Sequence, residues 1–516
     1  MSNLTPLSVV DQLSGKQVFI TGATGFLAKA IVEKLLRETP EIKKIHLLIR
    51  GNNKQSAQQR CMHGVFASSL FNILREHHGE QFNSFIERKV CIVEGELTAP
   101  LFGLSSTQFS HLSSQLDLII NSAASVNFRE AMDQALQINT HSLNSIISLA
   151  NQGSQGITPV LQVSTCFVNG FNQGVMHENI NESASGLITK KVNGLYDIDP
   201  VINSIQQKIE ALKTRFANAI GGRKNAKYEE ALIQLGIKES RYYGWNDTYT
   251  FTKWLGEQLL LKGLDQNNLT ILRPSIIESA VSSPLPGWVE GVKVADALIY
   301  AFAKGRVNIF PGDGQALLDV IPVDLVANAA LLSSAELLTG SSKYRIYQCC
   351  SGSSNPIKVN EFIDILTVAS HEQYQYLPKL FSDKPNENFK TVSPQKFKVY
   401  MLLLTVFTWA KTISGRISGS KKASMLMAKV KTTASLAVIF GFYSAAKYQF
   451  DSRKLETLQA RFKLEDQILF NANANSFNWQ HYLAKIHLPG LHKYALADKT
   501  VLVSKLKVKE EKKKVA

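Results

Sequence analysis

The chain has 516 residues, of which 45% are hydrophobic and 19% charged, an ordinary globular composition with ample material for a large core. Its formal net charge is +15, and residues 411–431 and 505–516 together contribute +10 of that excess. We expect these basic stretches, which lie near apolar runs, to face an anionic membrane surface or a polyanionic ligand. Nucleic acid is disfavoured because no finger, RNP or helix-turn-helix pattern accompanies the charge.

Cysteine usage and the apolar runs bear on the cellular compartment. The five cysteines show no metal-ligand spacing, and the adjacent Cys349 and Cys350 would make a poor disulfide, which predicts a reducing cytoplasm. Residues 1–16 lack the basic and apolar regions of a signal peptide. The apolar runs 399–410 and 434–446 are too short to span a bilayer. We expect them to be buried helices or to lie in a membrane interface, in a protein that is cytoplasmic or peripheral at the membrane.

The first recognisable unit of the chain is a strand, a glycine turn, a helix and a second strand. A short apolar run at 18–20 precedes the turn, apolar residues then recur at helical spacing to residue 36, and 45–49 is the second strand. Gly22 allows the tight turn, and Gly25 lets the backbone approach a pyrophosphate on the helix N-terminus. The complete βαβ context disfavours an ordinary glycine-rich turn. The predicted dinucleotide contacts of the turn are Gly22, Thr24, Gly25, Phe26 and Leu27.

The second strand ends in Arg50 and not in an acidic residue. An acid at this place would bind a ribose 2′-hydroxyl and repel a 2′-phosphate, whereas an arginine does the opposite. With Arg60 as a second candidate for the same phosphate, the sequence favours NADP(H) over NAD(H). The alternative is that Arg50 is a solvated loop cation.

Further strands are expected at 91–93, 116–120, 160–163 and 269–273, alternating with helices to about residue 280. This alternation predicts an α/β fold built on a doubly wound parallel Rossmann sheet. Pockets in such sheets open at the carboxyl ends of the strands, which brings the residues that follow each strand to one rim. The predicted residues there are Glu96, Leu97, Ala123, Thr165, Pro274, Ser275 and Ile276, with Asn139 on the helix after 116–120.

Tyr249 and Lys253 stand one helical turn apart, so their side chains point the same way. A lysine ammonium beside a phenol favours the phenolate, which would let the tyrosine exchange its proton near neutral pH. Taken alone, the pair could equally be two surface residues. The 84 residues between Thr165 and Tyr249 are long for one connection, and 201–235 has helical spacing. We therefore expect an inserted helical lid at about 171–241.

Beyond about residue 356 the alternation of strands and helices fades. We therefore divide the chain into an NADP-binding Rossmann reductase domain at 1–356, a mostly helical C-terminal domain at 357–500 and a basic tail at 501–516. The tail could contact an anionic ligand or could be a disordered solubilising extension.

Taken in order, these motifs resemble the extended short-chain dehydrogenase/reductases. Within that superfamily they are similar to the fatty acyl-CoA reductases, which are close to the thioester reductase domains of carboxylic acid reductases. The resemblance covers residues 15 to about 356 well and 479–491 more loosely. Ala28 and Glu96 depart from it, since they stand where Gly and Asp are usual. The segments that carry the resemblance are the glycine turn, residues 47–50 with Arg60, and residues 95–97, 121–128, 163–170, 244–249, 272–276, 284–288 and 320–324.

The resemblance implies roles for the residues at the rim. Tyr249 would be the general acid, Lys253 would lower its pKa and hold the nicotinamide ribose, and Thr165 would hydrogen-bond the reacting oxygen. Asn139 would support Lys253 through water. The implied reaction is NADPH-dependent reduction of a long-chain acyl thioester, on coenzyme A or an acyl-carrier protein, to an aldehyde and then to a primary alcohol, as in fatty alcohol and wax ester formation.

Alternatives stay open on the sequence alone. A thioester reductase could stop at the aldehyde. A hydroxysteroid or sugar dehydrogenase of the same superfamily is disfavoured by the two arginines and by the match at 284–288. A membrane-associated NADP-binding module without turnover is disfavoured by the intact pair of Tyr249 and Lys253.

Overall fold

The computed structural model of the chain describes residues 6–180, 182–217, 222–291, 294–305, 309–340, 345–385, 390–417 and 441–496. At its centre is a seven-stranded sheet in the order β11-β7-β5-β4-β1-β2-β3, and every pairing in it is parallel. The prediction of a doubly wound Rossmann sheet is confirmed. The strands are β1 (Gln17–Thr21), β2 (Lys44–Ile49), β3 (Val90–Glu94), β4 (Leu118–Asn121), β5 (Val160–Val163), β7 (Leu269–Pro274) and β11 (Ile346–Cys349).

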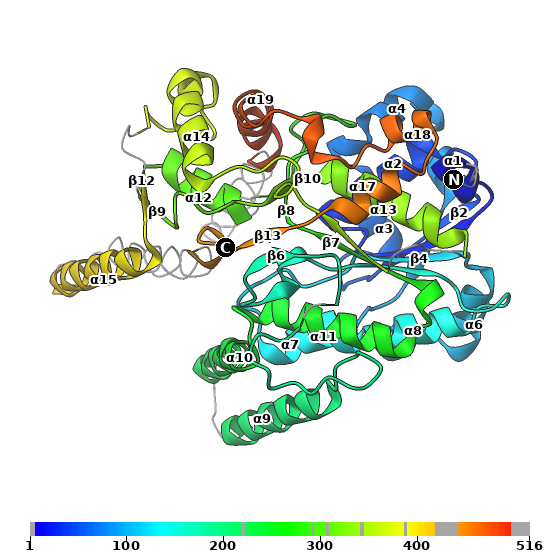
Figure 1. Cartoon of the computed structure of the whole chain (residues 1–516), viewed down its shortest axis with the longest axis horizontal. Coiled ribbons are helices and arrows are strands. Elements are labelled where there is room, and N and C mark those ends of the chain that lie inside the picture. Colours follow the sequence, from blue (N-terminus) through cyan, green and yellow to red (C-terminus); the bar gives the residue numbers. More distant parts are fainter. Residues whose placement is uncertain are drawn as a thin grey trace, which may run out of the picture.

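Helices cover both faces of the sheet, which explains why the central strands are apolar without alternation. On one face lie α2 (Phe26–Glu38) and α13 (Val323–Leu338), and on the other lie α8 (Leu143–Asn151) and α11 (Thr248–Gly263), as Figure 1 shows. The two faces accordingly belong to separate apolar clusters, one containing Ile31 of α2 and the other containing Leu260 of α11. All four residues of β4 and all four of β5 are buried.

The remaining described helices complete these two layers or extend from them. They are α1 (Val9–Leu13), α3 (Ala57–Cys61), α4 (Asn72–His78), α5 (Phe82–Lys89), α6 (Ser106–Gln115), α7 (Met132–Leu136), α9 (Asp199–Ala217), α10 (Gly222–Tyr243), α12 (Val294–Ala303), α14 (Val359–Gln373), α15 (Pro394–Ile417), α17 (Arg453–Gln459), α18 (Leu464–Leu469), α19 (Trp479–His481) and α20 (Leu488–Gly490).

The strand order reverses between β1 and β4, which are neighbours in the sheet although two strands lie between them in the chain. Their register pairs Thr21 with Asn121, so the loops that follow the two strands leave the sheet side by side. In doubly wound sheets a crevice opens at such a switch point and holds the nucleotide. The fold therefore places the glycine turn against residues 122–124.

Several strands have no counterpart in the sequence-based expectations. The strand β11 adds a seventh member to the sheet beyond residue 280, where only six strands in all were expected. Three further parallel pairs consist of three-residue strands, which are too short to show a periodic pattern. They are β8 (Ile276–Glu278) with β10 (Val320–Pro322), β9 (Ile309–Pro311) with β12 (Lys390–Val392), and β6 (Gly174–Met176) with β13 (Tyr448–Phe450).

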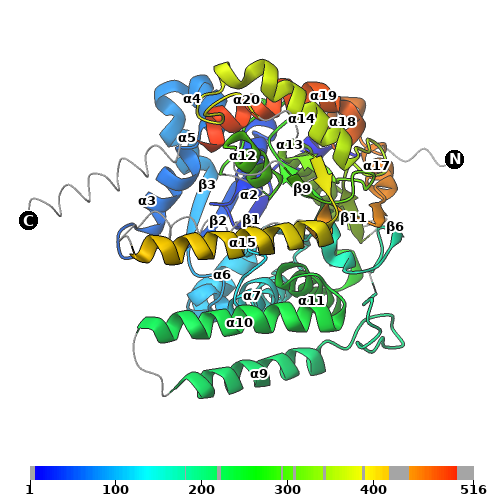
Figure 2. The same cartoon turned by 90° about the vertical axis from the view of Figure 1, so that its left-hand side faces the viewer.

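The long interval between Thr165 and Tyr249 contains the two helices α9 and α10. Figure 2 shows them side by side below the sheet, where α10 also contacts α11 and α7. The helical spacing noted at 201–235 thus corresponds to real helices.

The C-terminal elements wrap back onto the Rossmann sheet. Leu455 of α17 and Phe462 share an apolar cluster with Val9 and Leu13 of α1, at the opposite end of the chain. The backbone amide of Val9 donates to the carboxylate of Asp466 over 2.7 Å. The first and last parts of the described chain are therefore packed into one core.

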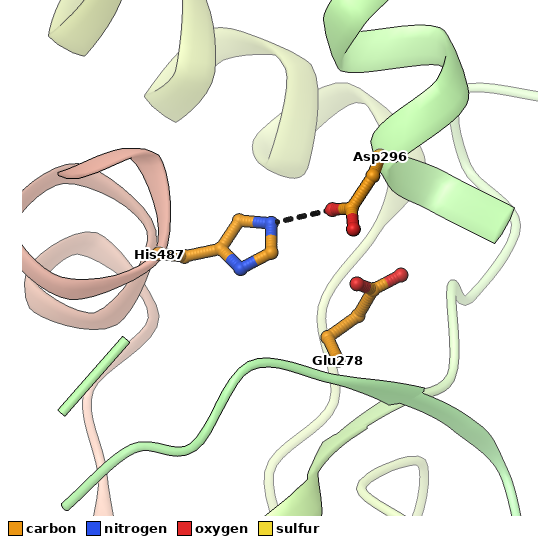
Figure 3. A group of neighbouring side chains, drawn as sticks. All are labelled: Glu278, Asp296 and His487. Atoms are coloured by element: carbon orange, nitrogen blue, oxygen red, sulfur yellow. Dashed lines mark ion pairs between the residues drawn. The ribbon is translucent and has the colours of Figure 1, made fainter. Parts of the chain in front are cut away.

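A buried polar group ties another C-terminal segment to the sheet. In Figure 3 the ring of His487, from the π-helical turn Tyr482–His487, points at Asp296 of α12, and Glu278 of β8 lies beside them. His487 Nε2 lies 3.0 Å from Asp296 Oδ1, and its Nδ1 lies 2.9 Å from the Ser279 hydroxyl. Because both ring nitrogens are engaged by protein atoms, we interpret the group as a structural hydrogen-bonded tie.

Some predicted features cannot be placed. Residues 418–440 and 497–516 lie outside the described residues. They include most of the basic stretch 411–431, the start of the apolar run 434–446 and the whole tail 501–516. Among the helices that are described, none has the length and apolar character needed to cross a membrane.

Candidate active site

The glycine turn between β1 and α2 has the geometry of a phosphate cradle. Gly22 has φ +74°, and a Cβ at this position would lie 2.8 Å from the backbone nitrogen of Ala123. Gly25 occupies the N-cap position of α2 and, as a glycine, has no side chain that could hydrogen-bond the first amides of the helix. The first amides of α2 are therefore available to an anionic ligand, at the end where the helix dipole is positive.

A cavity of about 540 Å³ opens over this turn at the switch point of the sheet. It is lined by residues that follow β1, β2, β3 and β4 and by residues of α7 and the turn after it. A dinucleotide fits this setting, because glycines line the floor and helix amides face the opening. Its predicted lining residues are Gly22, Thr24, Gly25, Arg50, Glu96, Leu97 and Ala123, and it also includes Thr98, Ser122, Ala124, Gln134, Gln137 and Ile138.

Arg50 and Glu96 meet at the mouth of the cavity. Arg50 Nη1 lies 2.7 Å from Glu96 Oε2, and the arginine side chain is 65% exposed. Arg60 does not line the cavity, but its guanidinium donates to the backbone carbonyl of Arg50. The residue expected to hold a 2′-phosphate is thus paired with the acid that departs from the usual family pattern.

The other predicted cofactor contacts lie outside the lining of this cavity. Phe26 stacks on Trp288 with ring centroids 4.9 Å apart, and Leu27 is buried in the core. The carbonyl of Pro274 accepts from the Thr165 hydroxyl over 3.4 Å, and the Ser275 amide donates to Cys349 over 3.0 Å. The prediction that these residues and Ile276 contact the cofactor remains a prediction.

The helix α11 carries Tyr249 and Lys253 in its first two turns. Asp247 caps it, because its carboxylate accepts from the Thr250 amide over 2.9 Å and from the Thr250 hydroxyl over 3.1 Å. Further along, Gly256 permits a close approach of the neighbouring segment. A Cβ on Gly256 would lie 2.4 Å from the carbonyl oxygen of Asn139.

Asn139 lies in a π-helical turn, Gln137–His141, beside α11. Its amide nitrogen donates to the carbonyl of Ser125 over 3.2 Å and to the hydroxyl of Thr252 over 3.1 Å. Its amide oxygen accepts from the Ser125 amide over 3.0 Å. Asn139 thus fixes the loop after β4 to α11, while its predicted water link to Lys253 stays a prediction.

Thr165 and Tyr249 meet at the carboxyl end of β5. The Thr165 hydroxyl lies beside the Tyr249 phenol and accepts from the Phe167 amide over 3.3 Å. Burial raises the pKa of Tyr249 well above its usual range, the charge of Asp247 raises it further, and the nearby Thr165 hydroxyl lowers it. The phenol is therefore protonated at neutral pH, as a proton donor must be.

Lys253 is almost completely buried one turn further on. Its ammonium donates to the carbonyl of Val163 over 2.8 Å. Burial lowers the pKa of Lys253 to about 8, against the opposing charge of Glu257. The ammonium of Lys253 faces the end of β5, and the prediction that it lowers the pKa of Tyr249 stays a prediction.

A buried polar ladder connects the phosphate turn with Lys253. The hydroxyl of Thr21 bonds to the Asn121 amide oxygen, Asn121 Nδ2 donates to Gln162 Oε1 over 2.7 Å, and Gln162 Nε2 donates to the Val163 carbonyl over 2.8 Å. The ladder was not predicted. Asn121 and Gln162, polar residues at the ends of otherwise apolar strands, were the signal that could have revealed it.

An aromatic cluster closes the site beside Tyr249, and it also escaped prediction. The ring of Phe128 meets Tyr249 edge-on at 5.7 Å and lies 5.5 Å from the ring of Tyr443. Tyr443 in turn packs on Phe167 at 4.8 Å, and its hydroxyl donates to Asp247 Oδ2 over 2.5 Å. Tyr443 thus contacts both Asp247, the N-cap of α11, and the rings around the phenol.

Cys166 lies next to Thr165 but packs against the core. It is fully buried, its thiol donates to the Arg273 carbonyl over 2.9 Å, and burial raises its pKa. All five cysteines are free thiols. A protonated, buried thiol is a poor nucleophile, which agrees with a packing role for Cys166.

The parallel sheet, the phosphate turn and the Thr165–Tyr249–Lys253 group together define a nicotinamide-dependent oxidoreductase of the short-chain dehydrogenase/reductase type. Comparison with protein families gives two matches described as male sterility protein, over residues 20–330 and 400–498. The chain is 31% identical to fatty acyl-CoA reductase 2, chloroplastic, of Arabidopsis thaliana over 511 residues, covering 95% of this chain and 80% of that protein. It is 29% identical to the alcohol-forming fatty acyl-CoA reductase of Simmondsia chinensis, and the match covers 95% of this chain and 99% of that protein.

The chain belongs to the fatty acyl-CoA reductase family, as the resemblance indicated. Solved structures agree on the fold. The terminal R domain from the myxalamid PKS-NRPS pathway has a TM-score of 0.57 at 17% identity, covering 93% of this chain and 90% of that one. The reductase domain of a non-ribosomal peptide synthetase from Mycobacterium tuberculosis has a TM-score of 0.54 at 16% identity, and the match covers 95% of this chain and 96% of that one.

Proposed function

We propose that this protein reduces a long-chain fatty acyl-CoA, or the same acyl group on an acyl-carrier protein, to the primary alcohol through an enzyme-held aldehyde. The observation that carries the proposal is the placement of the Thr165 hydroxyl beside the Tyr249 phenol at the end of β5, with Lys253 one turn away. Such a pair offers two hydroxyl groups to one carbonyl oxygen. Relatives named fatty acyl-CoA reductases support the choice of substrate.

The cofactor we propose is NADPH, on the strength of Arg50 and Arg60. Arg50 borders the cavity and Arg60 bonds to its backbone, so a 2′-phosphate placed there would meet positive charge. Glu96 must release Arg50 for that contact to form. Gly22, Thr24 and Gly25 would hold the pyrophosphate, and Lys253 the nicotinamide ribose.

The chemistry divides between the cofactor and the side chains. When bound, NADPH would supply a hydride to the carbonyl carbon of the thioester. Thr165 and Tyr249 would hydrogen-bond the oxygen as it gains negative charge. The C–S bond would then break, coenzyme A would leave as a thiol that takes up a proton, and the aldehyde would remain. In a second round, with the hydride of a second NADPH added to the aldehyde, Tyr249 would give its proton to the alkoxide and produce the alcohol.

The surroundings of Tyr249 suit a water-sensitive intermediate. The ring of Phe128 contacts Tyr249, and Tyr443 and Phe167 pack behind it, an arrangement that would keep water from one side of the phenol. We propose that α9 and α10 form the lid over the acyl group and that the helical region 357–500 shelters its chain. The basic stretches would bind coenzyme A or place a cytoplasmic protein peripherally at a membrane.

Purified protein incubated with palmitoyl-CoA and NADPH tests this proposal. We expect hexadecanol as the product, with two NADPH oxidised for each coenzyme A released. The thiol released, the NADPH consumed and the product mass are measured together. Hexadecanal with one NADPH consumed would contradict the alcohol-forming step, and no thiol release from any long acyl-CoA would contradict the proposal as a whole.

A further inference from the structure

The helix α15 displays a wide, solvent-exposed apolar face. Its exposed apolar residues have exposed fractions between 42% and 64%. On the other side of the helix, Phe397 and Met401 are buried against Ile309 and Val392. One side thus anchors the helix to the protein, while the opposite side faces outward. The outward residues are Val399, Tyr400, Leu402, Leu403, Val406, Phe407 and Trp409.

The outward residues recur at helical spacing and therefore form one continuous surface. Positions 399, 402, 403, 406 and 409 repeat every three or four residues, so their side chains stack along one side. Figure 1 shows α15 extending outward from the body at the left, and Figure 2, which views that side, shows it at the front. A contiguous apolar patch of this kind marks an interaction surface, not ordinary scatter of exposed residues.

The charge of the surrounding sequence identifies the kind of partner. Residues 388–450 contain ten lysines and arginines and no aspartate or glutamate. Lys396 is exposed in the first turn of α15 itself. A wide apolar face within an exclusively basic segment complements a lipid bilayer that carries negative head groups. A protein partner would not require the complete absence of acidic residues.

We propose that α15 is an interfacial helix that lies in the surface of an anionic bilayer. Leu402, Leu403, Val406, Phe407 and Trp409 enter the boundary between head groups and acyl chains, and the lysines contact the head groups. The helix does not span the membrane, consistent with its apolar length. The inference rests on the proposed function for its purpose, because a long-chain alcohol product dissolves in such a bilayer.

Trp409 allows insertion to be observed directly. It is 57% exposed, whereas the other four tryptophans, Trp245, Trp254, Trp288 and Trp479, are at most 7% exposed. Titration with vesicles of phosphatidylcholine containing 30% phosphatidylserine should shift the emission to shorter wavelength as Trp409 leaves water. Trp409→Phe should bind the same vesicles without this shift.

A pair of serine substitutions tests whether α15 supplies the binding energy. Leu403→Ser with Phe407→Ser should lower the vesicle partition coefficient by at least about tenfold, because two apolar anchors are lost. The matched control is Leu464→Ser with Ile468→Ser, which removes two side chains that are 69% and 74% exposed on α18. The control should bind the vesicles like the wild-type protein. Pure phosphatidylcholine vesicles should bind the wild-type protein at least tenfold more weakly.

Each other outcome overturns the proposal. Absence of wild-type binding, or equal binding of the α15 variant, excludes a membrane role for this helix. A wild-type dimer that the α15 variant turns into a monomer would assign the face to a second copy. A loss of thermal stability in the α15 variant but not in the control would mean that another part of the chain covers the face. Palmitoyl-CoA reduction without vesicles is measured separately, so failure of the reductase activity is distinguishable from failure of binding.

Discussion

The cofactor cavity and the aromatic cluster around Tyr249 are built in opposite ways. The cavity is made mainly of short segments that follow β1, β2, β3 and β4, and its lining includes the small residues Gly22, Gly25, Ala123 and Ala124. The cluster joins Phe128, Phe167 and Tyr443, which lie far apart in the chain, through large side chains. A local motif specifies the first region, whereas tertiary packing alone assembles the second.

The largest effect is expected at the cavity, where backbone space is the critical quantity. Gly22→Val places a side chain 2.8 Å from the Ala123 nitrogen at a positive φ, so we expect NADPH binding to weaken by at least about a hundredfold. Gly15→Val is the matched control, because Gly15 also has a positive φ but nothing within 4 Å of its Cβ. It should lose stability and keep affinity. Fluorescence titration with NADPH measures the affinity of both variants. Equal losses of affinity in the two would contradict a specific role of the Gly22 turn.

At the cluster, Tyr443→Phe removes a hydrogen bond to the buried carboxylate of Asp247. We expect a loss of about 1–3 kcal/mol in the free energy of unfolding and a fall of about tenfold in kcat/KM, with NADPH affinity unchanged. Tyr448→Phe is the control, since the Tyr448 hydroxyl has no hydrogen-bond partner among the described residues. Denaturant unfolding and steady-state kinetics compare the two. Equal effects would show that Tyr443 acts through packing and not through Asp247.

Lys253, one helical turn from Tyr249, should give NADPH binding a pH dependence. Because its pKa is lowered to about 8, the ammonium loses its proton as the pH rises through that value. If the charged form holds the ribose, the dissociation constant should rise about tenfold between pH 7 and pH 9. Lys253→Arg keeps its charge over this range and should give a flat profile. A flat wild-type profile would remove Lys253 from the cofactor site.

The smallest effect is expected at the exposed pair of Arg50 and Glu96. Arg50→Ala should weaken NADPH binding by about threefold to tenfold and leave NADH unaffected, because exposed charges are screened by solvent. Glu96→Gln frees the arginine and should strengthen NADPH binding by a fewfold. Isothermal titration with both cofactors tests the pair, and an equal effect of Arg50→Ala on NADPH and NADH would contradict 2′-phosphate recognition.

The sequence predicts the Rossmann sheet and the cavity because both depend on local patterns. Apolar runs and the Gly22–Gly25 spacing are visible within about 30 residues, and seven of the predicted contacts line one cavity. The pair of Tyr249 and Lys253 was recognisable because helical spacing alone aligns them. The placement of Thr165 near Tyr249 was predicted from the rule that strand ends meet at one rim.

The remainder depends on long-range packing that no local pattern records. Tyr443 reaches Asp247 across 196 residues, and β13 pairs with β6 although three-residue strands have no periodicity. Burial raises the pKa of Tyr249, an effect that residue spacing cannot predict because the extent of burial is a property of the folded protein. Residues that complete a motif from a distant part of the chain are thus found only in the structure.

Replacement of Tyr249 by phenylalanine is the most direct test of the account. The variant should bind NADPH as the wild-type protein does and lose palmitoyl-CoA reduction by a factor of about 10²–10⁴, the usual contribution of a general acid. Tyr242→Phe, which alters an exposed tyrosine at the end of α10, should retain full activity. Activity of the Tyr249 variant within a few-fold of wild type, at unchanged NADPH binding, would contradict the claim that this phenol serves the reacting oxygen.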